Sequence, residues 1–369
     1  MQEGITFVGL DAHKEANSVA MLLPGAMVPV QWDVVNESSA LKRMVRKVER
    51  EAPGEVRFCY EAGSVGYALQ RQIVEVGSER VSCMVVAPSL VPRKPGVRIK
   101  TDRRDARKLA ELLRAGLLTE VQPPTLGDEA IRDLCRARED AKQDLTRYRH
   151  RLGKMLLRKG LIYRGEAWTF RHRLWVRGLR FEYPAEQSVL DDYLLAIEQL
   201  QERLKGLDEK IEAVSKKAPY GEAAGWLRCF RGIDTITAMT ILSELYGFPR
   251  FQSPRGLMAF VGLIPSEQTS GYDPKRGGIT KTGNGHVRRV LIEAAWHYRH
   301  RPGVRSVQQR RQGQPAEVIA LADKAQQRLY RRYRRMTERG MPSPKAVTAI
   351  ARELTGFIWA TLSRPVKSA

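Results

Sequence analysis

Short apolar runs alternate with amphipathic segments in the first third of the chain. Five runs have the length and β-branched character of strands, and they lie at residues 5–10, 18–23, 28–35, 56–60 and 81–86. Helices are predicted at 38–51, after Ser64, and from Thr101 onward. We therefore expect an α/β domain over residues 1–125, in which the first three strands form a meander.

The hydrophobic period changes after Pro123-Pro124. One heptad pattern is broken only by Arg138 and comprises Ile131, Leu134, Ala141, Leu145, Tyr148, Leu152 and Met155. In a second, more regular pattern Leu190, Ile197, Leu204 and Ile211 are seven residues apart, which is typical of a coiled coil. The pattern fits two long helices of one bundle as well as pairing between chains, and we favour pairing between chains. We expect a helical coiled-coil region over 126–220.

The remaining residues, 221–369, predict a mainly helical domain. A final helix presents Val347, Ile350 and Leu354 on one face, as a core-facing helix does. The expected fold class is thus α/β plus all-α. The segment from Phe230 to Ala238 resembles a helix-hairpin-helix turn, whose glycine would let backbone amides approach a phosphate.

Charge indicates a polyanionic partner. The chain has 63 Lys and Arg against 41 Asp and Glu, a net charge of +22, while its 43% hydrophobic content indicates a folded protein. Residues 146–180 hold eleven Lys or Arg and a single acid, Glu166. Aromatic residues are interleaved with these cations: Tyr148, Tyr163, Trp168, Phe170 and Trp175. This density predicts a nucleic-acid surface that includes stacking on unpaired bases.

Several classes of protein are disfavoured. The four cysteines form no C-x-x-C pair and the six histidines no H-E-x-x-H motif, so we expect no zinc site and take each histidine as a surface or core residue. Widely spaced cysteines fit a reducing cytoplasm. We see no signal peptide, and no apolar run approaches the roughly 18 residues that a membrane span requires.

Four carboxylates are placed where the predicted elements begin or end. Asp11 and Glu61 follow the first and fourth strands, while Asp102 and Asp105 open the last helix of the domain one turn apart. Each alone fits a turn or a helix start. The predicted elements follow the order of the ribonuclease H fold: three meandering strands, a helix, and then alternating strands and helices. In that fold strands one and four are neighbours. The four acids would then converge, and Mg²⁺ or Mn²⁺ would be needed to neutralise them.

The motifs D-A-H-K-E after strand one, Y-E-A-G after strand four and K-T-D-R-R-D-A at the last helix resemble the RuvC-like domain of the IS-one-ten family of insertion-sequence transposases. The resemblance assigns that family's four metal-binding catalytic carboxylates to Asp11, Glu61, Asp102 and Asp105. Further along, L-I-P-S-E-Q-T-S-G, R-G-G-I-T-K-T-G-N and A-A-W-H-Y-R are similar to the transposase domain of the same family. That similarity implies that Ser270 is the nucleophile, although Ser266 and Thr269 are near it.

The resemblance implies a recombinase that cuts and rejoins DNA through a covalent 5′-phosphoserine. It also implies a structured non-coding guide RNA that pairs with donor and target DNA, and a homo-oligomer, from dimer to tetramer, at the nucleoid in the cytoplasm. Two alternatives stay open. One is a RuvC-like structure-selective nuclease that uses water as its nucleophile, and the other is a non-enzymatic protein that packages RNA or DNA.

Overall fold

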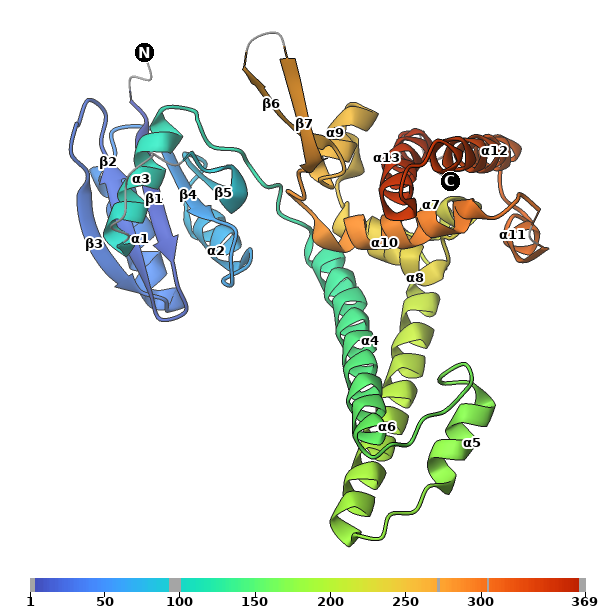
Figure 1. The fold of residues 1–369 in the computed structure, drawn as a ribbon. Coiled ribbons are helices and arrows are strands. Elements are labelled where there is room, and N and C mark those ends of the chain that lie inside the picture. Colours follow the sequence, from blue (N-terminus) through green and yellow to red (C-terminus); the bar gives the residue numbers. More distant parts are fainter. Residues whose placement is uncertain (1–3, 93–100, 271–272, 304, 365–369) are drawn as a thin grey trace. The chain divides into compact units, whose positions relative to one another are not determined.

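The computed structural model describes residues 4–92, 101–270, 273–303 and 305–364, with the backbone alone at 268–270, 273–276 and 305–306. The chain divides into two compact units, Met1–Pro123 and Pro124–Ala369. They are called unit 1 and unit 2 below, and each is described by itself. Figure 1 labels the elements of both units.

Unit 1 is built on a five-stranded sheet in the order β3-β2-β1-β4-β5 (Figure 1). Its strands are β1 (Thr6–Ala12), β2 (Ala16–Leu22), β3 (Val30–Val35), β4 (Val56–Glu61) and β5 (Val81–Val86). Its helices are α1 (Ser38–Glu51), α2 (Ala68–Val76), the short η1 (Pro88–Leu90) and α3 (Asp102–Arg114). The predicted meander is confirmed, because β1, β2 and β3 pair in antiparallel fashion. The predicted neighbourhood of strands one and four is also confirmed, because β1 and β4 are parallel partners.

The two faces of this sheet follow the alternation of side chains along each strand. Leu10 and Tyr60 point to the face covered by α1 and α2, where they are fully buried. Phe7 and Cys59 point to the opposite face and pack against α3. Both faces are therefore covered, which explains why the central strands read as continuous apolar runs.

Gly9 lets α3 approach β1 at backbone distance. A Cβ atom at this position would lie 2.2 Å from the carbonyl oxygen of Ala106 and 2.5 Å from the amide nitrogen of Ala110. Only glycine fits so close an approach. Because α3 is pressed against β1 here, the first turn of α3 comes to lie beside the carboxyl end of β1.

The last residues of unit 1 lie alongside β5 at the edge of the sheet. The amide of Val121 donates to the carbonyl oxygen of Val85 (2.7 Å), and the amide of Ala87 donates to that of Thr119 (3.0 Å). Val121 also packs against the core under α1 and α2. The exposed edge of β5 is thereby partly covered.

Unit 2 begins with two long helices, α4 (Leu126–Arg158) and α6 (Pro184–Val214), which lie side by side (Figure 1). The heptad residues of the two helices share one buried cluster, in which Leu145 and Leu152 of α4 meet Leu190, Ile197 and Leu204 of α6. The pairing that the structure shows is thus within the chain. Pairing between chains stays a prediction.

The basic aromatic segment folds against this helix pair, and three of its rings pack against one another. Residues 159–183 include α5 (Phe170–Gly178). Trp168, Trp175 and Tyr163 pack around the buried His172, with ring centroids 4.9 to 5.8 Å from it. These three rings are half-buried, and their stacking on unpaired bases stays a prediction. Phe170 is the exception, with 73% of its surface exposed.

The rest of unit 2 is a helical core that carries one β-hairpin. Its elements are α7 (Gly221–Arg228), α8 (Thr235–Glu244), η2 (Phe248–Arg250), α9 (Pro254–Phe260), β6 (Pro265–Ser270), β7 (Asp273–Ile279), α10 (Gly285–Trp296), η3 (His297–Arg299), α11 (Arg305–Arg310), α12 (Ala316–Glu338) and α13 (Ser343–Leu362). Val347, Ile350 and Leu354 of α13 are fully buried in this core, as predicted. None of the helices in the described part of the chain has both the length and the apolar character needed to cross a membrane.

Gly232 serves packing in the turn between α7 and α8. Its φ is +80°, and a Cβ atom there would lie 2.5 Å from the carbonyl oxygen of Ala294 in α10. The sequence pattern assigned this glycine to the approach of a phosphate. In the structure its missing side chain makes room for a neighbouring helix.

Candidate active site

Asp11 and Glu61 lie next to each other at the carboxyl ends of β1 and β4. The parallel register pairs Leu10 with Tyr60, so the residues that follow them stand side by side. Alternation turns Asp11 to the same face as Gly9, and Glu61 to the same face as Cys59. That is the face covered by α3.

The first turn of α3 brings Asp102 and Asp105 to the same place. The helix begins after Thr101, whose Oγ1 accepts a hydrogen bond from the amide of Arg104 at 3.4 Å, as an N-cap does. We call Asp11, Glu61, Asp102 and Asp105 the acidic edge. The sequence predicted that these four residues would gather, and the backbone of unit 1 places all of them at one end of the β1–β4 pair, on the α3 side.

The side chains show a tighter subset. Oxygens of Asp11 and Asp102 and a ring nitrogen of His13 all lie within 4.8 Å of one another. His13 Nε2 is 3.4 Å from Asp11 Oδ2 and 3.7 Å from Asp102 Oδ1. Glu61 and Asp105 lie outside this group of three.

The pKa of Asp11 is raised at the acidic edge. Partial burial raises the pKa of Asp11, the nearby His13 opposes that rise, and the negative charges of Asp102 and Asp105 add to it. A carboxylate whose neighbours are other carboxylates is expected to bind a cation. The donor set, mostly carboxylate oxygens with one imidazole nitrogen, fits a divalent ion such as Mg²⁺ or Mn²⁺.

His13 is the member of this group that sequence reasoning missed. The histidines were set aside as surface or core residues, and His13 was not considered together with Asp11. No local pattern reveals it, because β1 ends at Ala12 and the contact of His13 with Asp102 depends on the packing of α3 against β1.

Ser270 is the last residue of β6, in a hairpin that projects from the helical core of unit 2 (Figure 1). Its backbone is paired with Asp273, while its side chain lies outside the described atoms. The same holds for the side chain of Thr269. Ser266, at the base of the hairpin, is exposed and donates a hydrogen bond to the carbonyl oxygen of Gly278 at 3.1 Å.

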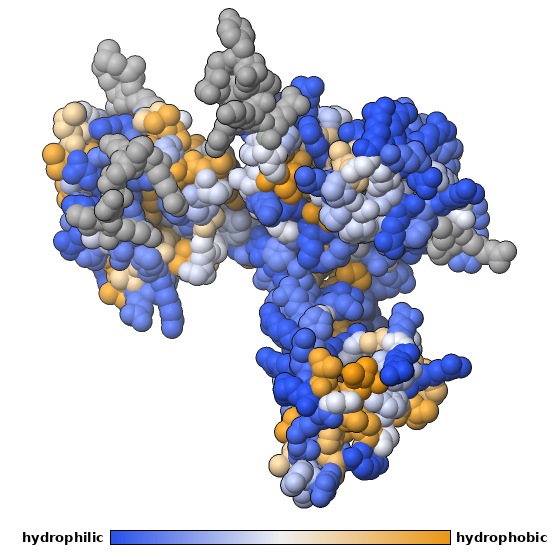
Figure 2. All heavy atoms as spheres, viewed as in Figure 1, coloured by the Kyte–Doolittle hydropathy of each residue, from blue (hydrophilic) through white to orange (hydrophobic). Residues whose placement is uncertain are grey.

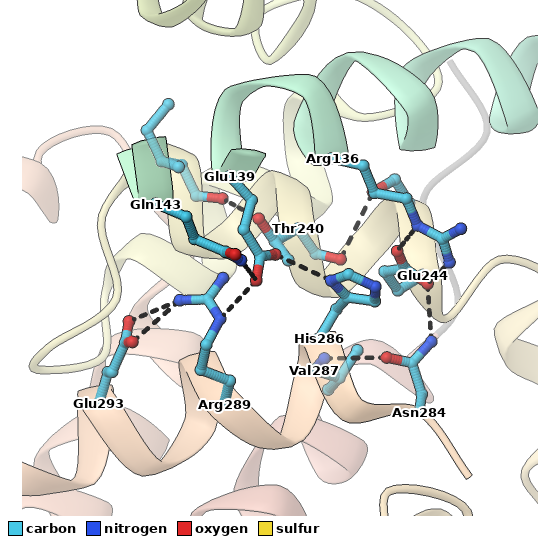
Figure 3. A network of polar contacts seen from close by, with 12 residues as sticks. Arg136, Glu139, Gln143, Thr240, Glu244, Asn284, His286, Val287, Arg289 and Glu293 are labelled. Atoms are coloured by element: carbon cyan, nitrogen blue, oxygen red, sulfur yellow. Dashed lines mark hydrogen bonds and ion pairs between the residues drawn. The ribbon is translucent and has the colours of Figure 1, made fainter. Parts of the chain in front are cut away.

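A network of polar contacts holds the start of α10, which follows this hairpin, to α4 and α8 (Figure 3). Glu244 of α8 has 3% of its surface exposed and accepts hydrogen bonds from Arg136 Nε of α4 (2.7 Å) and from Asn284 Nδ2 (2.7 Å). Asn284 follows the hairpin and caps α10, because its Oδ1 accepts from the amide of Val287 at 2.9 Å.

The same network contains Glu139 of α4. Its carboxylate is 2.8 Å from Nδ1 of His286 and accepts from Nε of Arg289, also at 2.8 Å (Figure 3). Burial alone would raise the pKa of Glu139, but these two partners outweigh it and lower the pKa below its ordinary value.

Comparison with known proteins gives matches at both ends of the chain. Residues 8–159 match a family model described as a transposase with a DEDD domain of the IS110 type, and residues 225–309 match the transposase IS116/IS110/IS902 family. The first match spans Asp11, Glu61, Asp102 and Asp105, and the second spans Ser270.

Individual relatives agree with these models. The chain is 36% identical to the transposase for insertion sequence element IS1533 of Leptospira borgpetersenii, over 89% of this chain and 96% of that protein. It is 41% identical to y4qE of Sinorhizobium fredii, whose name also contains the word transposase, over 96% of this chain and 87% of that protein. A transposase for insertion sequence element IS1111A of Coxiella burnetii is 25% identical over 77% of this chain.

Proposed function

The chain belongs to the IS-one-ten (IS110) family of insertion-sequence transposases and is a DNA transposase, and on that premise we propose how it acts. Strand cleavage and rejoining take place by divalent-metal-assisted phosphoryl transfer, with Ser270 as the nucleophile. The observation that carries the proposal is the convergence of Asp11 and Asp102, with the pKa of Asp11 raised by burial and opposed by His13. The non-enzymatic packaging alternative does not hold, because the family consists of DNA transposases.

The acidic edge would hold the ions that this family requires. Asp11, Glu61, Asp102 and Asp105 are the proposed ligands, and Mg²⁺ or Mn²⁺ are the proposed ions. A bound divalent ion would neutralise the charge that develops on the phosphate during transfer. The protein keeps the carboxylates in place through the packing of α3 on Gly9.

Ser270 would attack a DNA phosphate through its hydroxyl oxygen. The oxygen–phosphorus bond forms while the bond to the 3′-oxygen breaks, so that a 5′-phosphoserine ester and a free 3′-hydroxyl result. The serine proton passes to a base as the bond forms, and the leaving 3′-oxygen takes up a proton from water. Such an ester preserves the energy of the phosphodiester bond, which hydrolysis would lose, so a second strand can be joined afterwards.

Residues 126–220 are the proposed nucleic-acid-binding and oligomerisation region, between a RuvC-like domain at 1–125 and a transposase domain at 221–369. The eleven cations of 146–180 support binding of a structured guide RNA, which would select donor and target DNA. Exposed apolar residues gather near α5, at the far end of the α4–α6 pair, and support a homo-oligomer (Figure 2). They are Leu157, Ile162, Phe170 and Leu174.

The test is a search for a covalent protein–DNA adduct. A labelled DNA substrate is incubated with enzyme, guide RNA and Mg²⁺ and then quenched in detergent, and the linked residue is mapped by mass spectrometry. We expect an adduct at Ser270 that Ser270→Ala abolishes together with rejoining, whereas Ser266→Ala and Thr269→Ala have milder effects. Cleavage without an adduct would favour the structure-selective nuclease that uses water.

A further inference from the structure

One face of α12 carries a row of cations. Its members recur every three or four residues, which places them on one side of the helix: Lys324, Arg328, Arg331, Arg332, Arg335 and Arg339. All six side chains are exposed, and they line a hollow of about 610 Å³ together with Gln327 and Met336. We call these six residues the α12 basic face. In Figure 2 the surface over α12 is coloured almost uniformly as hydrophilic.

The opposite side of α12 fixes this face in position. Ala322, Ala325 and Leu329 are buried in the core of unit 2. The helix therefore cannot turn its cations away from solvent without giving up apolar contacts with that core.

Only part of the positive charge is neutralised by the protein. Glu353 of α13 accepts hydrogen bonds from Arg328 and Arg332, and it orients these two guanidinium groups. The other four members of the face have no ion pair within the described part of the chain. Six cations and one shared carboxylate leave a net charge of about +5 on one helix face.

The length of the face fits a polymer better than a small anion. Lys324 and Arg339 are fifteen residues apart, which corresponds to about 22 Å along the helix axis. A metabolite phosphate would engage two or three of these cations, whereas a nucleic-acid backbone presents a phosphate to each. Arginine, which makes up five of the six, is well suited to bidentate contacts with phosphate.

The composition of the face favours a duplex over a single strand. Binding of unpaired bases relies on exposed aromatic rings. Of the two tyrosines on α12, Tyr333 is buried and its hydroxyl donates to Ser343 Oγ, while Tyr330 is half-buried. Neither belongs to the basic face, so its contacts are those of a phosphate backbone.

We infer that the α12 basic face is a docking surface for the phosphate backbone of duplex DNA, separate from the segment at 146–180 that we assign to RNA. The inference rests on the chain being a DNA transposase, which must hold duplex donor or target DNA. It does not depend on Ser270 or on the metal. These contacts would involve phosphates and no base edges, so they would add affinity and fix the position of the protein on DNA of any sequence.

The test uses the full chain with Arg331→Gln, Arg335→Gln and Arg339→Gln combined, since these three residues are exposed and their removal leaves the Glu353 contacts intact. Binding of a labelled 30-base-pair duplex of arbitrary sequence is measured by fluorescence anisotropy between 50 and 300 mM KCl. We expect at least about tenfold weaker binding at 150 mM, and a salt dependence whose slope falls by about 3. The covalent adduct at Ser270 should still form at saturating DNA, which separates a failure of this inference from a failure of the proposed chemistry.

The matched control is the triple variant Arg43→Gln, Arg46→Gln and Arg50→Gln on α1, which removes the same charge from an exposed helix face of unit 1. Its slope should change by less than about 1. Three outcomes would overturn the inference. They are unchanged duplex affinity in the α12 variant, an equal loss in the α1 variant, and a loss confined to a structured RNA hairpin measured in parallel.

Discussion

Asp11 in unit 1 and Glu139 in unit 2 are both partly buried carboxylates in polar clusters, yet their pKa values move in opposite directions. Burial raises the pKa of Asp11 and the neighbouring acids of α3 add to the rise. Burial also acts on Glu139, but the hydrogen bonds from Arg289 and His286 lower its pKa. The difference therefore lies in the partners.

In the cluster around Glu139 and Glu244 each carboxylate has partners from the protein (Figure 3). Arg289 and His286 contact Glu139, and Arg136 and Asn284 contact Glu244. Asp11 instead faces Asp102, with His13 as their shared contact. The first arrangement joins helices of unit 2, while the second leaves the pKa of Asp11 raised. Perturbed acids of the second kind are typical of functional sites.

The largest expected effect comes from Asp11→Asn, which removes a proposed metal ligand. We expect the rate of DNA cleavage to fall by at least about 100-fold. Mutation of residues that only hydrogen-bond to metal ligands already lowers metal affinity or activity about 10–100-fold. DNA binding should be unchanged. The measurement is single-turnover cleavage of labelled DNA in Mg²⁺, beside a binding titration with the same duplex.

Glu75→Gln is the control for Asp11→Asn, since Glu75 is an exposed acid on α2 of the same unit. It should cleave at the normal rate. Normal cleavage by Asp11→Asn, or by the unaltered enzyme in excess chelator, would remove the acidic edge from the mechanism. Asp11→Asn should not lower thermal stability without metal, because a raised pKa means that the ionised carboxylate is disfavoured by folding.

The second-largest expected effect is the loss of stability in Glu244→Ala, a variant of the cluster around Glu139 and Glu244. It removes the acceptor shared by the amide of Asn284 and the guanidinium of Arg136, which is 39% exposed, and the loss of hydrogen bonds to a buried carboxylate costs about 1–3 kcal/mol. The measurement is urea unfolding of the full chain, followed by tryptophan fluorescence. Glu293→Ala, which removes an exposed partner of Arg289, should cost less than about 1 kcal/mol. Equal losses in the two variants would contradict the structural role of Glu244.

The smallest effect is the pH dependence of Glu139→Gln. A carboxylate with a lowered folded-state pKa stabilises the protein above its ordinary value of 4.5, and this contribution is lost as pH falls through the lower folded-state value. The variant should therefore be about 1 kcal/mol less stable at pH 7, and the gap should close as the pH falls below 4.5. Urea unfolding at several pH values measures it, and a gap that stays constant with pH would contradict the assigned partners.

Much of unit 1 could be predicted from sequence because its signals are local. Apolar runs of strand length gave the five strands, and α1 begins and ends where its periodicity predicted. The order of the elements predicted that Asp11, Glu61, Asp102 and Asp105 would converge, and the side chains of Asp11 and Asp102 do lie close together. The assignment of all four as metal ligands stays a prediction. His13 was missed because its proximity to Asp102 depends on tertiary packing.

Unit 2 was harder to predict because each of its sequence patterns is compatible with more than one structure. A heptad repeat does not say which helix it pairs with, and the structure pairs α4 with α6 in one chain. Aromatic residues among arginines fit both a binding surface and packing within the protein. In the structure Trp168 and Trp175 pack against His172. The contacts of Glu139 and Glu244 join helices more than a hundred residues apart in sequence, which no local pattern reveals.

The close approach of α3 to Gly9 also has a consequence during protein synthesis. The strand that carries Asp11 leaves the ribosome first, while Asp102 and Asp105 follow on the order of ten seconds later at typical elongation rates. Until α3 emerges, the sheet face formed by Phe7 and Cys59 stays uncovered and two of the four carboxylates do not exist. The acidic edge therefore cannot assemble before α3 has been synthesised, although it can form while unit 2 is still being made.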